Sequence, residues 1–283
     1  MLRTKSGVLS RVSANGDEVR VDGDALNTLV GEDSGYLERN HASWEAWARQ
    51  SAAAARRRWT SDELRWGLWD SPESELRLIE GAEPRADVVE LGCGAAEISA
   101  WLARGGLMPV AVDFSRAQLD AADALQRQHG LSFPLIVANA EEVPYDNASF
   151  DIAVSEYGAS LWCDPRRWLP EANRLLRPGG SLIFITNAAL LMACTPPDGG
   201  RAGDRLERAY FGNYRIEFQD DDTVEFHPTH SQWIALLRAT GFALETLIEI
   251  RPTHGSKPRH DFASVEWARL WPTEEIWVAR KAG

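Results

Sequence analysis

Between residues 87 and 185, short apolar runs alternate with longer amphipathic segments. The apolar runs fall at residues 88–91, 110–112, 135–137, 152–154 and 182–185, and the amphipathic segments end near Ala103, His129 and Leu176. Short buried strands that alternate with helices form a parallel sheet with helices on both faces. Beyond an irregular stretch, the pattern predicts a helix over 233–239, a strand over 242–250, a helix over 265–270 and a last strand over 276–279.

The segments before and inside this alternating region have a different character. Residues 1–35 are polar, and Asn15-Gly16 between two short apolar runs predicts a small hairpin. Residues 36–58 have helical periodicity, with Trp44, Trp47 and Ala48 on one face. A second helix is expected over 75–79, entered through Ser71-Pro72, which suits a helix start.

Composition narrows the range of partners. The 283 residues include 30 basic and 42 acidic side chains, and the net charge of −12 disfavours binding to a phosphate backbone. The one short basic cluster, Arg56-Arg57-Arg58, resembles the solvated end of a helix. The three cysteines are far apart and predict neither a metal site nor disulfides. With no apolar run of roughly 20 residues and no leader pattern, we expect a cytoplasmic protein without a membrane segment.

A glycine-rich turn carries the strongest chemical signal. A buried strand leads through Glu90 into Gly92-Cys93-Gly94 and then into a helix, a geometry in which backbone amides approach a ligand closely. Asp113 ends the next strand, where a carboxylate can accept hydrogen bonds from a ribose diol. Glu90 would repel a pyrophosphate but favours a cofactor that carries positive charge. The alternative is a tight strand-to-helix turn with no ligand.

Five ordered motifs resemble those of the class I S-adenosylmethionine-dependent methyltransferases, in the branch of ubiquinone, menaquinone and natural-product methyltransferases. They are Glu90-Leu91-Gly92-Cys93-Gly94, Val112-Asp113-Phe114-Ser115, Ala138-Asn139-Ala140-Glu141-Glu142-Val143-Pro144, Ser149-Phe150-Asp151 and Arg174-Leu175-Leu176-Arg177-Pro178-Gly179-Gly180. The resemblance implies a Rossmann-like, seven-stranded, mostly parallel sheet whose last strand is antiparallel. It divides the chain into an appendage at 1–35 and a methyltransferase domain at 36–283, with a helical lid at 36–80 and an inserted substrate cap at 193–229.

The resemblance also implies the cofactor contacts, with S-adenosylmethionine as the cofactor. The expected binding residues are Glu90, Gly92, Cys93, Gly94, Asp113, Phe114, Asn139, Ala140, Glu141 and Glu156. Two positions depart from the family pattern. Ala96 stands where many members have a third glycine, and we expect it to be tolerated because it lies inside the helix and needs no positive φ. Asn139 replaces a common aspartate, and its amide can still accept from the adenine amino group.

The acceptor side of the site is less defined by the sequence. Ligands of parallel sheets bind beyond the carboxyl ends of the strands, which favours Glu156 as a polar group that faces the acceptor; a cofactor contact or a helix cap is the alternative. His227 and His230 are candidate general bases, and a helix-capping role is the alternative for His230. Candidate pocket residues, for each of which plain packing is the alternative, are Tyr157, Tyr210, Tyr214, Trp59 and Trp69.

The sequence therefore predicts methyl transfer from S-adenosylmethionine to an oxygen or nitrogen of a small organic molecule. Three other classes remain open: a non-catalytic module that binds the cofactor for regulation or scaffolding, a methyltransferase that acts on protein or transfer RNA, and a nicotinamide-dependent dehydrogenase. We expect no nucleic-acid partner and no metal. The acceptor and the oligomeric state do not follow from the sequence.

Overall fold

A computed structural model of the chain describes residues 11–12, 18–19, 35–218, 222–253 and 255–283. The contacts divide the chain into two units, Met1–Gly35 and Tyr36–Gly283. In the first unit, β1 (Arg11–Val12) pairs antiparallel with β2 (Glu18–Val19), as the hairpin prediction requires. The predicted turn residues Asn15 and Gly16 lie outside the described residues.

One sheet organises the second unit. Within its described residues, seven strands pair in the order β12-β13-β9-β8-β5-β6-β7. The strands are β5 (Asp87–Leu91), β6 (Met108–Asp113), β7 (Leu135–Val137), β8 (Phe150–Glu156), β9 (Leu176–Asn187), β12 (Phe242–Glu249) and β13 (Glu274–Lys281). Strands β5 to β9 are parallel, and β13 runs antiparallel to both β9 and β12. This arrangement confirms the predicted Rossmann-like α/β class with an antiparallel last strand.

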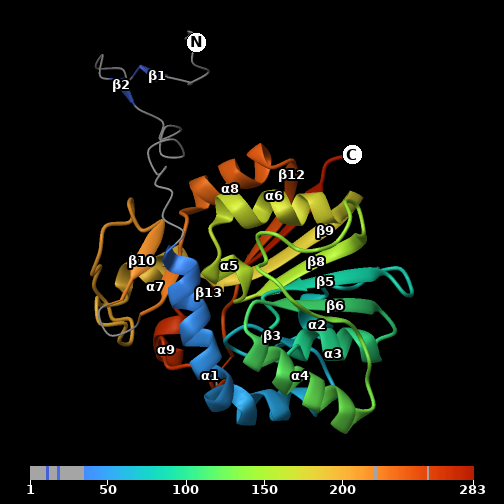
Figure 1. The fold of residues 1–283 in the computed structure, drawn as a ribbon. Helices are drawn as coiled ribbons and strands as arrows, with labels where there is room; N and C mark the ends of the chain where they lie inside the picture. Colours follow the sequence, from blue (N-terminus) through green and yellow to red (C-terminus); the bar gives the residue numbers. More distant parts are fainter. Residues whose placement is uncertain (1–10, 13–17, 20–34, 219–221, 254) are drawn as a thin grey trace. The chain divides into compact units, whose positions relative to one another are not determined.

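Helices cover both faces of the sheet. Figure 1 shows α6 (Pro165–Leu175) and α8 (His230–Ala239) over one face, and α3 (Glu97–Arg104) and α4 (Arg116–His129) over the other. Aromatic packing fills the α6 and α8 side, where the rings of Phe184 and Trp277 stack at 6.0 Å. Aliphatic residues of β8, β9 and β13 fill the opposite side together with α3. Because both faces are buried, the free edge where ligands can bind is the carboxyl end of the parallel strands.

The long helix α1 (Gly35–Trp59) is fastened across this edge through side chains near both of its ends. Near its start, the amide of Asn40 donates to the carbonyls of Trp162 and Val224 and accepts from the amide N–H of Val224, at 2.7–3.1 Å. At its end, the indole N–H of Trp59 donates to the carbonyl of Ala95, at 2.9 Å. Both ends of α1 are therefore attached to segments at this edge, and its role as a lid remains a prediction.

The segment after α1 differs from the prediction. Strands β3 (Arg65–Trp66) and β4 (Ser71–Pro72) form a hairpin, followed by the four-residue helix α2 (Glu73–Leu76). The helix predicted over 75–79 is present but lies over 73–76. Ser71 pairs with Trp66 rather than capping the helix, and the helix ends early because Arg77 is in a left-handed conformation at φ +55°.

The sequence pattern did not predict four short elements. Helix α5 (Ala159–Trp162) follows β8, and α7 (Ala189–Cys194) follows β9. The antiparallel pair of β10 (Arg215–Glu217) and β11 (Val224–Phe226) lies within the region 193–229. The helix expected over 265–270 is present as α9 (Val265–Ala268). Among the described residues, no helix is long and apolar enough to span a membrane.

Asn40 provides a direct test of the lid attachment. We expect Asn40→Ala to lower the free energy of unfolding by about 2–3 kcal/mol, because it leaves the buried N–H of Val224 without its acceptor. Urea denaturation of this variant measures the loss. The matched control is Glu38→Ala on the exposed side of α1, for which we expect a change within about 0.5 kcal/mol. Equal stability of the two variants would contradict the proposed attachment.

Candidate active site

The glycine-rich turn at the end of β5 lies directly against the backbone that follows β8. The N–H groups of Gly92 and Cys93 both donate to the carbonyl of Val112, at 2.9 and 3.0 Å. A Cβ on Gly92 would lie 2.6 Å from the Cα of Gly158, and a Cβ on Gly158 would lie 2.3 Å from the Gly92 carbonyl oxygen. Only glycine at both positions permits this approach, which brings the ends of two adjacent strands together.

Gly94 is the turn residue that leaves room for a ligand. Its φ is +53°, and the nearest atom to an added Cβ is the Oε1 of Gln118, 4.0 Å away. Its N–H donates to Oδ2 of Asp113 at 2.8 Å, which ties the turn to the end of β6. The backbone at Gly94 is therefore fixed in place with open space in front of its α-carbon.

Ala96, at the third glycine position of the family, corrects one prediction. It is not inside the helix but is the residue before α3, and its φ is +58°, in the left-handed region. This conformation costs a non-glycine residue roughly 1–2 kcal/mol. Hydrogen bonds on both sides hold it there, from its N–H to Cys93 and from the N–H of Ala100 to its carbonyl, at 2.8 and 3.0 Å.

Glu90 is buried beneath the turn. Its Oε2 accepts hydrogen bonds from the amide and the hydroxyl of Ser99 in α3, with the amide at 2.9 Å. Burial raises its pKa to about 8, despite the two bonds from Ser99 that favour the charged form. Without a nearby cation, Glu90 is therefore mostly protonated at pH 7, and a bound positive charge would favour its ionised form.

Asp113 faces the turn from the end of β6. Its two oxygens accept the N–H groups of Gly94 and Ser115, each at 2.8 Å. Burial raises its pKa to about 6, against these two bonds. Each oxygen retains a second lone pair, so the carboxylate can also accept from a diol.

The predicted adenine-contacting residues lie beside α1. The ring of Phe114 meets that of His41 edge to face, with centroids 5.4 Å apart. Asn139 uses its side-chain oxygen to accept the N–H of Glu141 at 3.1 Å, and Ala140 is buried. Glu141 accepts the hydroxyl of Tyr36 and pairs with Arg167 at 2.8 Å. Glu141 thus connects the loop to the lid as well as bordering the predicted site.

Glu156 ends β8 and is held between two guanidinium groups. Its Oε1 accepts the N–H of Gly67 at 2.7 Å and a hydrogen bond from Arg259 at 3.0 Å, and its Oε2 accepts from Arg58 at 2.8 Å. Burial raises the pKa of Glu156, but the two arginines outweigh it, and the pKa is lowered overall. A permanently ionised and fully paired carboxylate is a poor proton acceptor.

Arg58 and Arg259 are site residues that the sequence reasoning missed. The expectation that the basic cluster is merely solvated is wrong for Arg58, because it binds Glu156 and lies 3.9 Å from Glu97 at the start of α3. Helical phase could have indicated this, since Arg58 follows Ala48 and Ala55 on the buried side of α1. Nothing local indicated Arg259, which arrives from the loop after β12.

The two candidate histidines lie in different environments. His227, just after β11, is buried; its Nε2 lies 2.6 Å from Glu225, and its Nδ1 has no partner among the described residues. His230 opens α8 and lies 2.6 Å from Glu275, whose bond raises the pKa of His230. Glu275 and Glu274 are consecutive in β13 and so point to opposite faces of the sheet. His230 is therefore on the face away from Glu274. Among the described residues, no group of His, Cys, Asp and Glu could hold a metal ion.

The predicted pocket aromatics do not converge on one point. Trp59 bonds to Ala95 at the glycine turn, and Trp69 donates to the hydroxyl of Thr273 at 2.7 Å. The hydroxyl of Tyr157, at φ +51°, donates to Oε2 of Glu274 at 2.9 Å. The hydroxyl of Tyr214 donates to Asp164, the residue before α6, at 2.5 Å, and the exposed ring of Tyr210 lies edge to face with that of Phe211.

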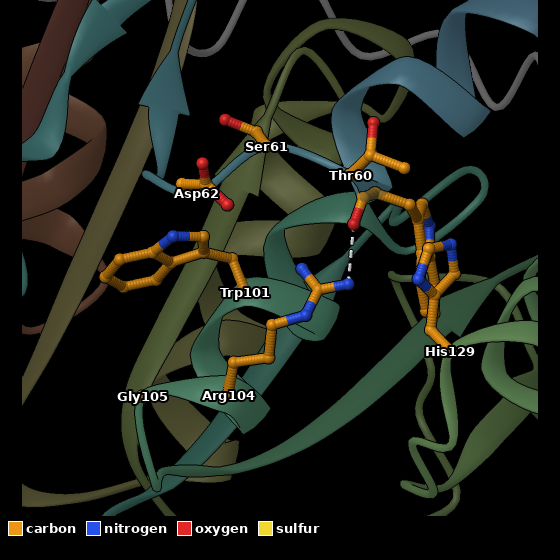
Figure 2. Close-up of a pocket in the computed structure, with 8 residues that line it drawn as sticks. Thr60, Ser61, Asp62, Trp101, Arg104, Gly105 and His129 are labelled. Atoms are coloured by element: carbon orange, nitrogen blue, oxygen red, sulfur yellow. Dashed lines mark hydrogen bonds between the residues drawn. The ribbon is translucent and has the colours of Figure 1, made fainter.

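A groove of about 510 Å³ lies where α1, α3 and α4 end (Figure 2). Its lining residues are Trp59, Thr60, Ser61, Asp62, Trp101, Arg104, Gly105 and His129. Arg104 crosses it and donates to the carbonyl of Trp59 at 2.6 Å, which completes the C-terminal end of α1. The groove shares only Trp59 with the predicted site residues, so we do not assign the cofactor to it.

Comparison with known proteins agrees with this geometry. Residues 89–184 match the family described as Methyltransferase domain. A malonyl-[acyl-carrier protein] O-methyltransferase of Hahella chejuensis is 31% identical over 211 residues, which cover 68% of this chain and 71% of that protein. An uncharacterized methyltransferase of Mycobacterium tuberculosis is 38% identical over 116 residues, 41% of this chain and 45% of that protein. The chain therefore spans less than half the length of the mycobacterial relative.

Solved structures share the fold at low sequence identity. An S-adenosylmethionine dependent methyltransferase from Mesorhizobium loti aligns with a TM-score of 0.60 at 23% identity, over 74% of this chain and 96% of that one. The [4+2]-cyclase SpnF aligns with a TM-score of 0.57 at 18% identity, over 86% and 94%. At these identities the likeness establishes the fold alone.

The fold is that of a Rossmann-like α/β protein, with the glycine-rich turn at the carboxyl edge of its sheet. The chain belongs to the class I S-adenosylmethionine-dependent methyltransferases, and S-adenosylmethionine is its cofactor.

The contact between the glycine turn and Gly158 can be tested by adding one methyl group. We expect Gly158→Ala to lower the free energy of unfolding by about 1–3 kcal/mol, because the new Cβ collides with backbone that cannot move aside. It should also weaken S-adenosylhomocysteine binding in calorimetry. Gly203→Ala is the control, since no atom lies within 4 Å of its added Cβ. Normal binding and stability in Gly158→Ala would contradict the close approach.

Proposed function

We propose that this chain transfers a methyl group from S-adenosylmethionine to an oxygen or nitrogen of a small organic molecule. The observation that carries the proposal is the pair of carboxyl groups at the ends of β5 and β6, Glu90 and Asp113, beside the open space at Gly94. With a pKa of about 6, Asp113 is ionised at neutral pH, and Glu90 would ionise beside a bound cation, so this edge favours a ligand with a sulfonium and an ammonium group. When bound, the cofactor supplies a methyl carbon already activated by positively charged sulfur.

The residues present fit this cofactor. Gly94 leaves its backbone approachable for the methionine portion, with Glu90 below it, and Asp113 retains lone pairs for the ribose hydroxyls. Phe114, Asn139 and Ala140 border the adenine position. Arg58 is the cation at this edge that suits the methionine carboxylate, since it lies between Glu97 and Glu156.

For the acceptor, we assign different roles to the candidate groups. Glu156 holds the β3–β4 hairpin through the N–H of Gly67 and also binds Arg58 and Arg259. Because these arginines neutralise its charge, we assign it a positioning role and no part in proton transfer. His230 holds the start of α8 through Glu275. His227 remains a prediction as a base, supported by its Nδ1, which has no hydrogen-bond partner within the described ranges of the chain. The exclusion of water and the alignment of acceptor and methyl group supply much of the acceleration in this chemistry.

The test is incubation of the purified chain with methyl-labelled S-adenosylmethionine and a cell metabolite extract, followed by separation of small molecules from macromolecules. We expect label in small molecules. Cofactor binding with no transfer to any fraction would identify a regulatory or scaffold module instead. Label confined to protein or RNA would identify a macromolecular substrate and overturn the small-molecule assignment.

A second prediction concerns the charge of Glu90. Because its pKa is raised to about 8, it ionises as the pH rises from 7 to 9, and the ionised form attracts a cation more strongly. We expect the affinity for S-adenosylmethionine, relative to that of Glu90→Gln, to rise by about fivefold over this range. Calorimetry at each pH measures both proteins. A ratio that does not change with pH would remove Glu90 from cofactor recognition.

A further inference from the structure

Two buried polar side chains face each other where β9 ends and β13 begins. Asn187 and Glu274 are direct partners in the antiparallel register, so their side chains lie on the same face of the sheet. Both are buried, with exposed fractions of 8% and 0%. They lie at the same edge as Glu156, and Glu274 contacts Tyr157, the residue that follows β8.

Glu274 has one occupied oxygen and one unoccupied oxygen. Its Oε2 accepts the hydroxyl of Tyr157 at 2.9 Å and the N–H of Leu68 at 2.5 Å. These two bonds fix the orientation of the carboxyl group. Its Oε1 and the Oδ1 of Asn187 are buried, and neither has a hydrogen-bond partner in the described part of the chain.

Unpaired buried acceptors are costly, typically about 1–3 kcal/mol each, and are retained where they serve a ligand or a bound water. Two of them lie at opposed register positions, at the edge where parallel sheets bind ligands, and they offer two acceptor oxygens to one ligand group. A ligand group that suits this pair carries O–H or N–H donors.

We propose that Asn187 and Glu274 form the subsite for the reacting hydroxyl or amine of the acceptor, and that Oε1 of Glu274 takes up its proton. This inference rests on the proposed methyl transfer and names residues and an acceptor class beyond it. The acceptor lone pair forms the new bond to the methyl carbon while the carbon–sulfur bond breaks with its electrons passing to sulfur. The acceptor proton moves to Oε1, and Glu274 becomes a neutral carboxylic acid.

The environment of Glu274 suits this role. Burial raises its pKa to about 7, against the bonds from Leu68 and Tyr157. The charged and titratable groups that act on it are Tyr157 and Glu156 from the end of β8 and Arg259 from the loop after β12, and the hairpin presents the N–H of Leu68. A base with a pKa near the working pH is the most effective one. Glu156, held ionised by its arginines, cannot replace it.

The test uses the full chain and its Glu274→Gln variant, with labelled S-adenosylmethionine and the acceptor fraction that the wild type labels. We expect Glu274→Gln to lower the transfer rate by about 100-fold or more, in the range found for loss of a general base. The affinity for S-adenosylhomocysteine should stay within about twofold of wild type, since the glutamine keeps the shape and the Leu68 bond. The wild-type rate should rise with pH up to about 7, and this rise should be absent in the variant.

Two further variants separate this role from a structural one. Asn187→Ala should raise KM for the acceptor more than it lowers kcat, as expected of a binding group. Glu275→Gln, on the opposite face of β13, should retain wild-type transfer. A further measurement does not depend on activity. The melting temperature of the wild type minus that of Glu274→Gln should decrease from pH 5 to pH 8, because the buried carboxyl of Glu274 becomes charged over this range.

The contrary outcomes are distinct. Failure of the wild type to bind S-adenosylhomocysteine would overturn the proposed function itself. Transfer at the wild-type rate in Glu274→Gln would overturn the subsite and leave the function standing. Loss of transfer in His227→Gln but not in Glu274→Gln would have the same meaning. Loss of S-adenosylhomocysteine affinity in Glu274→Gln, or methylation restricted to carboxylates, would also overturn it, because a carboxylate has no proton to give up.

Discussion

The close approach of Gly92 and Gly158 is the constraint on which the rest of the site depends. It brings the backbone at the end of β5 against the backbone that follows β8, at separations that no Cβ would permit. Gly94, in the same turn as Gly92, donates its N–H to Asp113 at the end of β6. The ends of β5, β6 and β8 therefore form one rigid edge. Helix α1 and the β3–β4 hairpin then attach to groups on this edge, through Ala95 and Glu156.

Charge at this edge is arranged in two ways. Glu156 is kept ionised by Arg58 and Arg259, and it organises the surrounding loops. Glu90, Asp113 and Glu274 lie in drier surroundings that raise their pKa values to between about 6 and about 8. These three carboxyls can change protonation near neutral pH when a cation or an acidic hydroxyl approaches. A positively charged cofactor and a proton-bearing acceptor are ligands of that kind.

Much of the fold could be predicted because strand and helix periodicity is local. The core strands were located to within a few residues, except that β9 begins at Leu176, six residues before the predicted run at 182–185. The glycine turn, Asp113 and the end of β8 followed from motifs with fixed spacing. Ala96 was misjudged because its φ is set by the turn, not by helix propensity. The β3–β4 hairpin, Arg259 and the pairing of Asn187 with Glu274 depend on contacts between residues far apart in sequence. Sequence periodicity carries no record of those contacts.

The central claim is that this carboxylate-lined edge recognises a positively charged adenosyl cofactor and rejects a dinucleotide. Calorimetry of the full chain with S-adenosylmethionine and with NAD, under identical conditions, tests it most directly. The account predicts saturable one-to-one binding of S-adenosylmethionine and no measurable binding of NAD, because its pyrophosphate would meet the ionised Asp113 and, at Glu90, a group that can compensate positive charge only. Binding of NAD with no binding of S-adenosylmethionine would contradict it.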